Sequence, residues 1–454
     1  MTKKYFGTDG IRGEANAFPM TAEIALKVAM SAALVLKKTR NGNHQNRVVI
    51  GKDTRLSGYM IEQAMAAGFT SMGLEVIFVG PIPTPGIAIL TRSLRADMGV
   101  MISASHNPYK DNGIKLFGAD GYKLSDDLEA QIETQIDQPI TDDMLPAADR
   151  VGQAKRLEDA TGRYIEYIKR SFPRGKTLEG LKVVVDCANG AAYKAAPQIL
   201  WELEAEVLAI GNKPNGRNIN EKCGATATQS LQEAVVENGY DIGIALDGDA
   251  DRLIVVDETG KRIDGDQIMA MLAIQGQKNG TLKNKAVVAT VMSNLGLEKF
   301  LGERDITLVR TAVGDRHVVE EMRANDYNLG GEQSGHLVLS DFGTTGDGIL
   351  AALQVLYALK ESGAKASEAL NVFKPLPQVL KSVRYGEFKP MENQDVLNKI
   401  EQAKQKLESS GRMLVRLSGT EPVIRVMAEG EDQTFVESIV NDVCETIEKL
   451  SKAS

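Results

Sequence analysis

Short runs of β-branched residues alternate with amphipathic segments from residue 47 onward, and this alternation constrains the fold more than any other feature. The chain reads RVVIGKD, then the helix-like SGYMIEQAMAAGF, then EVIFVG, the helix-like TPGIAILTRSL and GVMISAS. Strands that alternate with helical segments are typical of a βαβαβ unit with a parallel sheet. Ligands of such sheets bind outside the carboxyl ends of the strands, where Ser105 is expected.

Two later segments begin in the same way. LKVVVDCANGAA starts at Leu181 and NKAVVATVMSNLGL at Asn284, and each joins a buried-looking strand to a small-residue turn and a helical pattern. The sequence therefore predicts three similar α/β domains with mixed or parallel sheets. A length of 454 residues agrees with this prediction, because it is too long for one hydrophobic core.

The pattern changes near the C-terminus. A polar run at 137–156 and the segment FKPLPQ at 373–378 are interpreted as linkers. Beyond the second linker we expect a charged helix near 393–409, two strands in MLVRLS and VIRVMAE, and a last helix, which together form a smaller α+β domain. The predicted domains span residues 1–150, 151–256, 257–370 and 371–454.

Composition excludes several classes of protein. The net charge of −8 argues against a dedicated nucleic-acid binder, because phosphate backbones are bound by an excess of lysine and arginine. Cys187, Cys223 and Cys444 form no CxxC pair, which fits a reducing compartment. The start of the sequence lacks a signal-like apolar run, and the apolar stretch at 28–36 is far shorter than the roughly 20 residues that span a bilayer. A cytoplasmic protein without a membrane anchor is expected.

The segment ISASHNPYKDNGIK contains a candidate nucleophile. Ser105, His106 and Asn107 lie in a turn after a strand, with Lys115 a short loop away. A serine that accepts a phosphoryl group needs a base and nearby cations, which His106 and Lys115 could supply. A plain turn is the alternative, since serine and asparagine favour turns. A serine hydrolase is disfavoured, because its nucleophile elbow reads GxSxG and this segment reads SASHN.

The run GIALDGDADRLIVV contains a candidate metal site. Asp247, Asp249 and Asp251 alternate after an apolar strand, so in an extended backbone the three carboxylates share one face and repel one another unless a cation binds. Hard oxygen ligands select Mg²⁺ or Ca²⁺. A solvated acidic turn is the alternative. An EF-hand is rejected, because Arg252 occupies the position that requires glycine and the flanks are strand-like.

Two further loops carry groups suited to a phosphosugar. NLGGEQSGH presents Glu332, Ser334 and His336 on a glycine-rich loop, where a carboxylate and a hydroxyl could hold sugar hydroxyls, although a surface turn would also explain it. VRLSGTEPVIRV combines arginine forks, small hydroxyls and a tight turn, as a phosphate dianion requires. The candidate anion ligands of this loop are Arg416, Ser418, Gly419, Thr420 and Arg425.

These motifs, in this order, resemble those of the α-D-phosphohexomutase family over the whole chain. The resemblance implies an active site in the central cleft, where Ser105 carries a transferable phosphoryl group and coordinates one Mg²⁺ together with the three aspartates. Arg12 of FGTDGIRG is expected beside the phosphoserine. Substrate contacts are implied for Arg252, for Asp315 and Arg316 of TAVGDRHV, and for the two loops above. Members that act on glucosamine phosphates often have lysine where this chain has Leu417.

The resemblance also implies a reaction. Phospho-Ser105 donates to a hexose monophosphate, the bisphosphate intermediate reorients, and its other phosphate returns to the serine, while Lys115 or His106 handles the hydroxyl proton. YFGTDGIRG and GGEQSGH resemble members that convert glucosamine 6-phosphate to glucosamine 1-phosphate for cell-wall precursors, with glucosamine or glucose 1,6-bisphosphate as activator. Alternatives are a mutase of mannose or glucose phosphates, a metal-dependent phosphatase and a silent phosphosugar-binding protein. A homodimer is left open.

Overall fold

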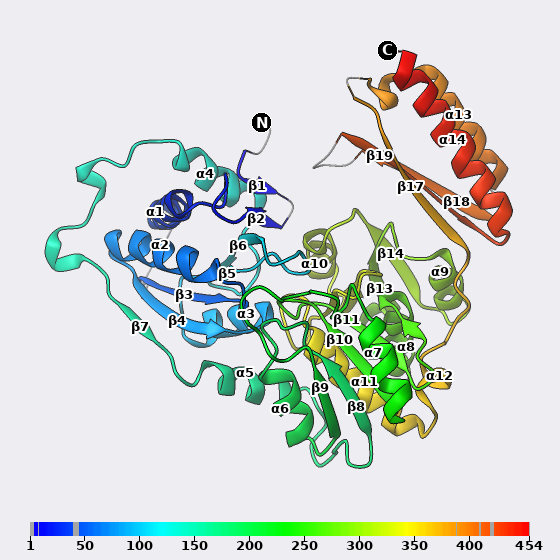
Figure 1. The fold of residues 1–454 in the computed structure, drawn as a ribbon, viewed down its shortest axis with the longest axis horizontal. Coiled ribbons are helices and arrows are strands. Elements are labelled where there is room, and N and C mark those ends of the chain that lie inside the picture. Colours follow the sequence, from blue (N-terminus) through cyan, green and yellow to red (C-terminus); the bar gives the residue numbers. More distant parts are fainter. Residues whose placement is uncertain are drawn as a thin grey trace.

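Four β-sheets follow one another along the chain, and helices pack against each of them (Figure 1). The structure is a computed structural model that describes residues 4–7, 9–39, 45–386, 388–407, 410–417 and 422–453. Among these residues, no helix combines the length and the apolar character needed to cross a membrane.

The first sheet is mixed, with antiparallel pairing from β1 to β5 and parallel pairing from β5 to β7, and it is covered on both faces. Its strands lie in the order β1 (Phe6–Gly7), β2 (Gly10–Glu14), β6 (Asp111–Gly118), β5 (Met98–Ile102), β3 (Arg47–Lys52), β4 (Glu75–Pro81) and β7 (Ala154–Arg156). Its helices are α1 (Ala22–Thr39), α2 (Gly58–Ser71), α3 (Thr84–Ser93) and α4 (Asp126–Ile136). Val48 and Ile50 belong to the apolar cluster with α1 and α2, and Val49 to the cluster with α3, because successive strand side chains point to opposite faces.

The second and third sheets repeat the mixed pattern with fewer strands. The second has the order β12 (Arg262–Ile263), β11 (Leu253–Asp257), β10 (Ile242–Leu246), β8 (Lys182–Asp186) and β9 (Glu206–Ile210), with α5 (Ala160–Lys169), α6 (Ala195–Glu202) and α7 (Gln229–Asn238). The third has the order β14 (Thr307–Thr311), β13 (Ala286–Thr290), β15 (Leu329–Gly331) and β16 (Leu337–Leu339), with α8 (Gly265–Asn279), α9 (Leu295–Gly302), α10 (Asp315–Ala324), α11 (Gly348–Ser362) and α12 (Ala366–Ala369).

The C-terminal unit is a three-stranded antiparallel sheet with two helices. Its strands lie in the order β17 (Gln378–Arg384), β19 (Val423–Gly430) and β18 (Gly411–Leu417), and its helices are α13 (Gln394–Leu407) and α14 (Gln433–Ala453). The sequence predicted only the second and third of these strands in chain order. β17 was missed because VLKSVR directly follows the proline-containing segment that was interpreted as a linker.

The first three units share one continuous core, whereas the fourth has its own. One apolar cluster contains Val49 from the first sheet, Val185 from the second and Val287 from the third. A separate cluster joins α13, α14 and the fourth sheet. The predicted fold class, three α/β units followed by a smaller α+β unit, is confirmed. The predicted domain boundaries stay predictions.

Candidate active site

Ser105 lies three residues after the end of β5 and faces the second domain. Its φ is 51°, in the left-handed region, and its side chain is buried. The hydroxyl donates a hydrogen bond of 2.5 Å to Asp247 Oδ2 and lies 3.2 Å from His106 Nδ1. The fold therefore brings the predicted nucleophile to the predicted metal loop, 142 residues later in the sequence.

A fully buried arginine that the sequence analysis missed holds the Ser105 loop. The Arg55 guanidinium donates to the carbonyl oxygens of Ser105 at 2.9 Å and Asn107 at 2.8 Å, and pairs with Asp53 at 2.8 Å. Asp53 accepts a hydrogen bond from Ser103 Oγ, which in turn accepts the Ser105 N–H at 2.9 Å. The available signal was the charged run KDTR directly after the apolar strand RVVIG.

The three aspartates of the metal loop converge, but the reason given in the sequence analysis was wrong. The chain turns between β10 and β11, with Ala250 in the left-handed region at φ 57°, and does not continue as an extended strand. One oxygen from each of Asp247, Asp249 and Asp251 lies within 4.8 Å of the others. Asp249 Oδ1 and Asp251 Oδ1 are buried without a hydrogen-bond partner among the described residues. Unpartnered carboxylate oxygens in this arrangement fit a hard cation such as Mg²⁺.

The carboxyl groups of this loop perturb one another. Burial, then Asp251 and Asp249, raise the pKa of Asp247 well above its usual value. Burial also acts to raise the pKa of Asp251, but the charges of Lys115 and His336 outweigh it and lower that pKa. A cation between the carboxylates would remove the repulsion that drives the shift at Asp247.

Lys115 is an almost fully buried ammonium group surrounded by carboxylates. Its Nζ lies 2.9 Å from Asp249 Oδ2, 3.2 Å from Asp9 Oδ2 and 3.5 Å from Asp251 Oδ2. Burial acts to lower the pKa of Lys115, but the three carboxylates outweigh burial and raise it. Lys115 is therefore charged at neutral pH.

His106 has the opposite character. Burial, then the charges of Arg252 and Arg12, lower the pKa of the imidazole to about 4. His106 is therefore neutral at pH 7 and can accept a proton. The two groups predicted to handle the hydroxyl proton thus differ in charge.

The glycine-rich loop between β15 and β16 faces the metal loop. Glu332 accepts hydrogen bonds from the Gly314 N–H and from Ser334 Oγ, each at 3.2 Å. His336 lies between two carboxylates, with Nδ1 3.6 Å from Asp251 and Nε2 3.5 Å from Asp315. Burial acts to lower the pKa of His336, but these carboxylates outweigh it and raise the pKa to about 9.

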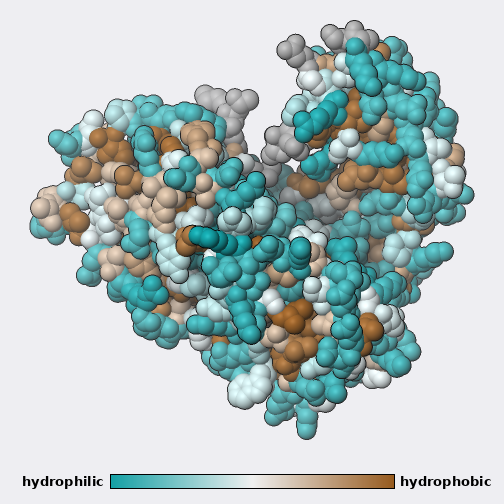
Figure 2. Space-filling view, in the orientation of Figure 1, coloured by the Kyte–Doolittle hydropathy of each residue, from teal (hydrophilic) through white to brown (hydrophobic). Residues whose placement is uncertain are grey.

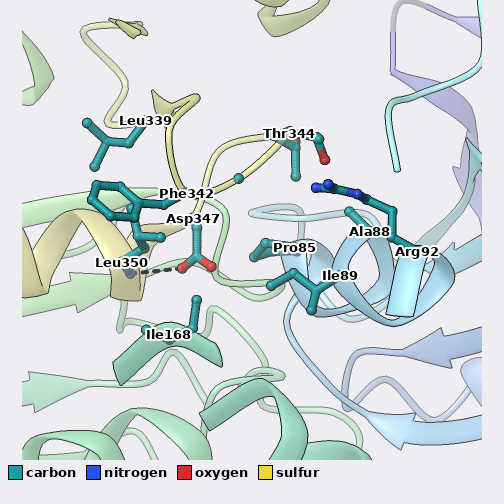
Figure 3. Close-up of a pocket in the computed structure, with 12 residues that line it drawn as sticks. Pro85, Ala88, Ile89, Arg92, Ile168, Leu339, Phe342, Thr344, Asp347 and Leu350 are labelled. Atoms are coloured by element: carbon teal, nitrogen blue, oxygen red, sulfur yellow. Dashed lines mark hydrogen bonds between the residues drawn. The ribbon is translucent and has the colours of Figure 1, made fainter. Parts of the chain in front are cut away.

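The loop before α11 contacts the His336 ring through a backbone amide. The Gly346 N–H points at His336 Nε2 at 3.2 Å, a contact that only the neutral ring accepts, so this amide and the carboxylates compete for the nitrogen. Figure 3 shows the same loop meeting α3 and α5, where Asp347 accepts the Leu350 N–H at 2.9 Å. Asp347 also accepts the Tyr164 hydroxyl at 3.0 Å. The cavity at this junction is only about 10 Å³, so the junction is packed and is not a ligand site.

Arg252 and the sugar-binding candidates border the same pocket. The backbone N–H of Arg252 donates to Asp247 Oδ1 at 3.2 Å, and the Nε of Arg252 is buried without a partner among the described residues. Arg252, Glu332 and Ser334 line a pocket of about 480 Å³. The pocket is large enough for a hexose phosphate, and Arg252 offers it a cationic donor.

Arg12 and Arg316 lie in different surroundings. Arg12 pairs with Asp9 and donates to the Ala104 carbonyl oxygen at 3.5 Å, so it lies beside the Ser105 loop. Arg316 pairs with Asp126 and, at 2.7 Å, with Glu129 of α4. In this conformation the Arg316 guanidinium links the first and third domains.

Two arginines of the C-terminal domain lie directly opposite each other. Arg416 of β18 and Arg425 of β19 are cross-strand partners, and neither forms an ion pair with another described residue. Like charges in this position repel, and an anion between them would remove the repulsion. Ser418, Gly419 and Thr420 lie outside the described residues. Figure 2 shows a hollow between the N-terminal lobe and the C-terminal domain, which leaves room for a substrate.

Comparison with known proteins agrees with this geometry. Profiles described as phosphoglucomutase/phosphomannomutase alpha/beta/alpha domains I, II and III match residues 3–142, 162–260 and 264–376, and the C-terminal domain profile matches 380–446. The chain belongs to the phosphoglucomutase/phosphomannomutase family. The resemblance inferred from the motifs is thereby confirmed.

Relatives within the family cover the whole chain. Phosphoglucosamine mutase of Allorhizobium ampelinum is 59% identical over 456 residues and covers 100% of both chains, and that of Parvibaculum lavamentivorans is 59% identical and covers 99% of both. A family protein from Burkholderia thailandensis has a similar structure, with a TM-score of 0.81 and 22% identity over 98% of this chain and 97% of its own.

A more distant structure has bound ligands. Aspergillus fumigatus N-acetylphosphoglucosamine mutase, in complex with GlcNAc-6P and magnesium, has a TM-score of 0.68 and 18% identity over 99% of this chain and 96% of its own. At such identities the likeness establishes the fold that the family members share.

Proposed function

We propose that this chain is an isomerase that interconverts glucosamine 6-phosphate and glucosamine 1-phosphate. The hydrogen bond of 2.5 Å between the Ser105 hydroxyl and Asp247 carries the proposal, because it joins nucleophile and metal loop in a chain 59% identical to phosphoglucosamine mutases over its full length. The Aspergillus fumigatus complexes with GlcNAc-6P and magnesium and with glucose 1,6-bisphosphate support a phosphosugar substrate, one Mg²⁺ and a bisphosphate intermediate. A glucosamine or glucose 1,6-bisphosphate activator first phosphorylates Ser105.

In the first transfer, a sugar hydroxyl bonds to the phosphorus of phospho-Ser105 while the bond between phosphorus and Oγ breaks. Mg²⁺ held by the three aspartates and the phosphoserine would offset charge on the phosphoryl oxygens. The sugar hydroxyl loses a proton and the Ser105 oxygen takes one up as its bond to phosphorus breaks, with Lys115 and His106 as the candidates for these steps. His106 Nδ1 lies 3.2 Å from Ser105 Oγ, the leaving oxygen, and we assign it to the proton of that oxygen, because Lys115 is held by three carboxylates. Arg12 and Lys115 add positive charge beside the serine.

The second half of the reaction requires the intermediate to turn without leaving. Glu332 and Ser334 hold sugar hydroxyls in either orientation, because both ends of the sugar must be presented in turn. Arg416 and Arg425, with Ser418, Gly419 and Thr420, bind the phosphate that is not being transferred. The reaction occurs in the cytoplasm, in the supply of cell-wall precursors, and the three free buried cysteines agree with a reducing compartment.

A coupled assay tests the proposal. The purified protein is given Mg²⁺, glucose 1,6-bisphosphate and either glucosamine, glucose or mannose 6-phosphate, and kcat/KM is compared. We expect the glucosamine compound to be preferred. A tenfold preference for glucose or mannose, about 1.4 kcal/mol in the transition state, would identify a different mutase, and release of inorganic phosphate would identify a phosphatase.

A further inference from the structure

Six side chains from three domains form a closed ring at the candidate site, in which two lysines and one histidine alternate with three aspartates. We call this the charge ring, and in order it consists of Lys123, Asp9, Lys115, Asp251, His336 and Asp315. The Lys123 Nζ pairs with Asp9 Oδ1 and lies 2.5 Å from Asp315 Oδ2. The other neighbouring pairs are 3.2 to 3.6 Å apart.

Lys123 closes this ring but has no part in the mechanism above. It lies in the loop after β6 of the first domain, whereas Asp315 begins α10 of the third, 192 residues later in the sequence. Its side chain is 11% exposed. Burial of an unpaired ammonium group is strongly unfavourable, so the two carboxylate partners of Lys123 compensate for its burial.

We propose that Lys123 is a positioning residue for the mutase reaction. It fixes Asp9 and Asp315, and through them holds Lys115 and His336 against Asp251 of the metal loop. This inference rests on the proposed function. Contact between the first and third domains does not depend on Lys123 alone, because Thr344 Oγ1 donates to the Gly121 carbonyl oxygen at 2.6 Å and Arg316 pairs with Glu129.

The test is a double-mutant cycle of K123M and D315N, measured with glucosamine 6-phosphate and Mg²⁺. We expect K123M to lower kcat at least tenfold and to change KM less than threefold. The double variant removes both members of the pair, so it should regain thermal stability relative to K123M. Because Asp315 is also a candidate substrate contact, the kcat of the double variant is compared with that of D315N. K123M should lower kcat less in the D315N background than in the wild type, because Lys123 acts partly through Asp315.

A K123M variant with wild-type kcat would show that Lys123 is only a structural ion pair, and an equal loss of kcat on K123M in the wild-type and D315N backgrounds would show that Lys123 does not act through Asp315. K283M is the matched control, because Lys283 forms an exposed pair with Asp326 at 2.9 Å, and it should keep wild-type kcat. If the wild-type protein turns over no glucosamine 6-phosphate, the proposed function itself fails.

Discussion

The backbone of Ser105 is held in a conformation that it would not adopt by itself. A left-handed φ in a residue other than glycine costs roughly 1–3 kcal/mol and persists only where the surroundings impose it. Arg55 and Asn220 donate to the Ser105 carbonyl oxygen at 2.9 and 2.8 Å, from the first and second domains. These two bonds aim the hydroxyl at Asp247.

The first prediction is that the isolated protein carries phosphate on Ser105. S105A should lose the phosphate and at least a thousandfold of kcat, because it removes the hydroxyl that donates to Asp247 of the metal loop. Intact mass and peptide mapping test this. S103A is the control and should still be phosphorylated. Phosphate on Ser103, or full activity in S105A, would contradict the assignment.

Asp249 provides the second prediction. Its Oδ1 is buried without a partner among the described residues, so D249N should weaken Mg²⁺ binding in calorimetry and lower kcat at least tenfold. Chelation should abolish activity, Mg²⁺ should restore it, and Zn²⁺ should serve poorly. D326N, in an exposed loop, should bind Mg²⁺ like the wild type. Activity in excess chelator would remove the aspartates from the mechanism.

The loops at the carboxyl ends of three strands form the site. β5 leads to Ser105, β10 to Asp247, and β15 to Glu332. The first of these loops rests on Arg55, which follows β3 and donates to four carbonyl oxygens of the loop. Such a brace is as much a part of the site as the residues that touch substrate.

The third prediction concerns this brace. R55M removes four loop hydrogen bonds to carbonyl oxygens and leaves Asp53 buried without its counter-charge, so we expect a loss of roughly 3–5 kcal/mol in the free energy of unfolding. Urea denaturation measures it. R163M, which breaks an exposed pair with Asp159 on α5, should cost less than about 0.5 kcal/mol. Equal losses would mean that Arg55 is not structural.

The start of α8 provides a prediction about pH. Burial, then the nearby Asp264, raise the pKa of Asp266 to about 7. A carboxyl group with a raised pKa in the folded state stabilises the protein at pH values below its unfolded pKa, and this stabilisation is lost as the pH rises to about 7. The amide of D266N does not titrate. The melting temperature of D266N minus that of the wild type should therefore increase between pH 4 and pH 7. A constant difference would contradict the shifted pKa.

On the scale of the whole molecule, the site is built from three domains with a common core and from a fourth domain with a core of its own. The first three domains share one core, which fixes Ser105, the metal loop and the glycine-rich loop relative to one another. The fourth domain has a separate core and contacts the third domain, where Glu429 Oε2 accepts the Leu295 N–H at 3.1 Å (Figure 1). A hollow separates it from the N-terminal domain (Figure 2). It presents two arginines with no carboxylate partner among the described residues.

The last prediction tests that domain. R425A should raise KM for glucosamine 6-phosphate at least tenfold, because the phosphate that is not being transferred loses a cation. Its melting temperature should not fall, because the substitution also relieves repulsion with Arg416. K381A, which removes an exposed contact with Asn441, should keep the wild-type KM. A lower melting temperature with unchanged KM would assign Arg425 a structural role instead.

The sequence by itself determined the alternation of strands and helices, the fold class, and the Ser105, aspartate and glycine-rich motifs. These features depend on neighbours within a few positions, so strand periodicity and turn chemistry reveal them. The structure alone placed Arg55, Asn220 and Lys123, and showed that the aspartates meet through a turn. Contacts such as Lys123 with Asp315 join residues 192 positions apart, and only the packing of three domains on one core brings their charges together.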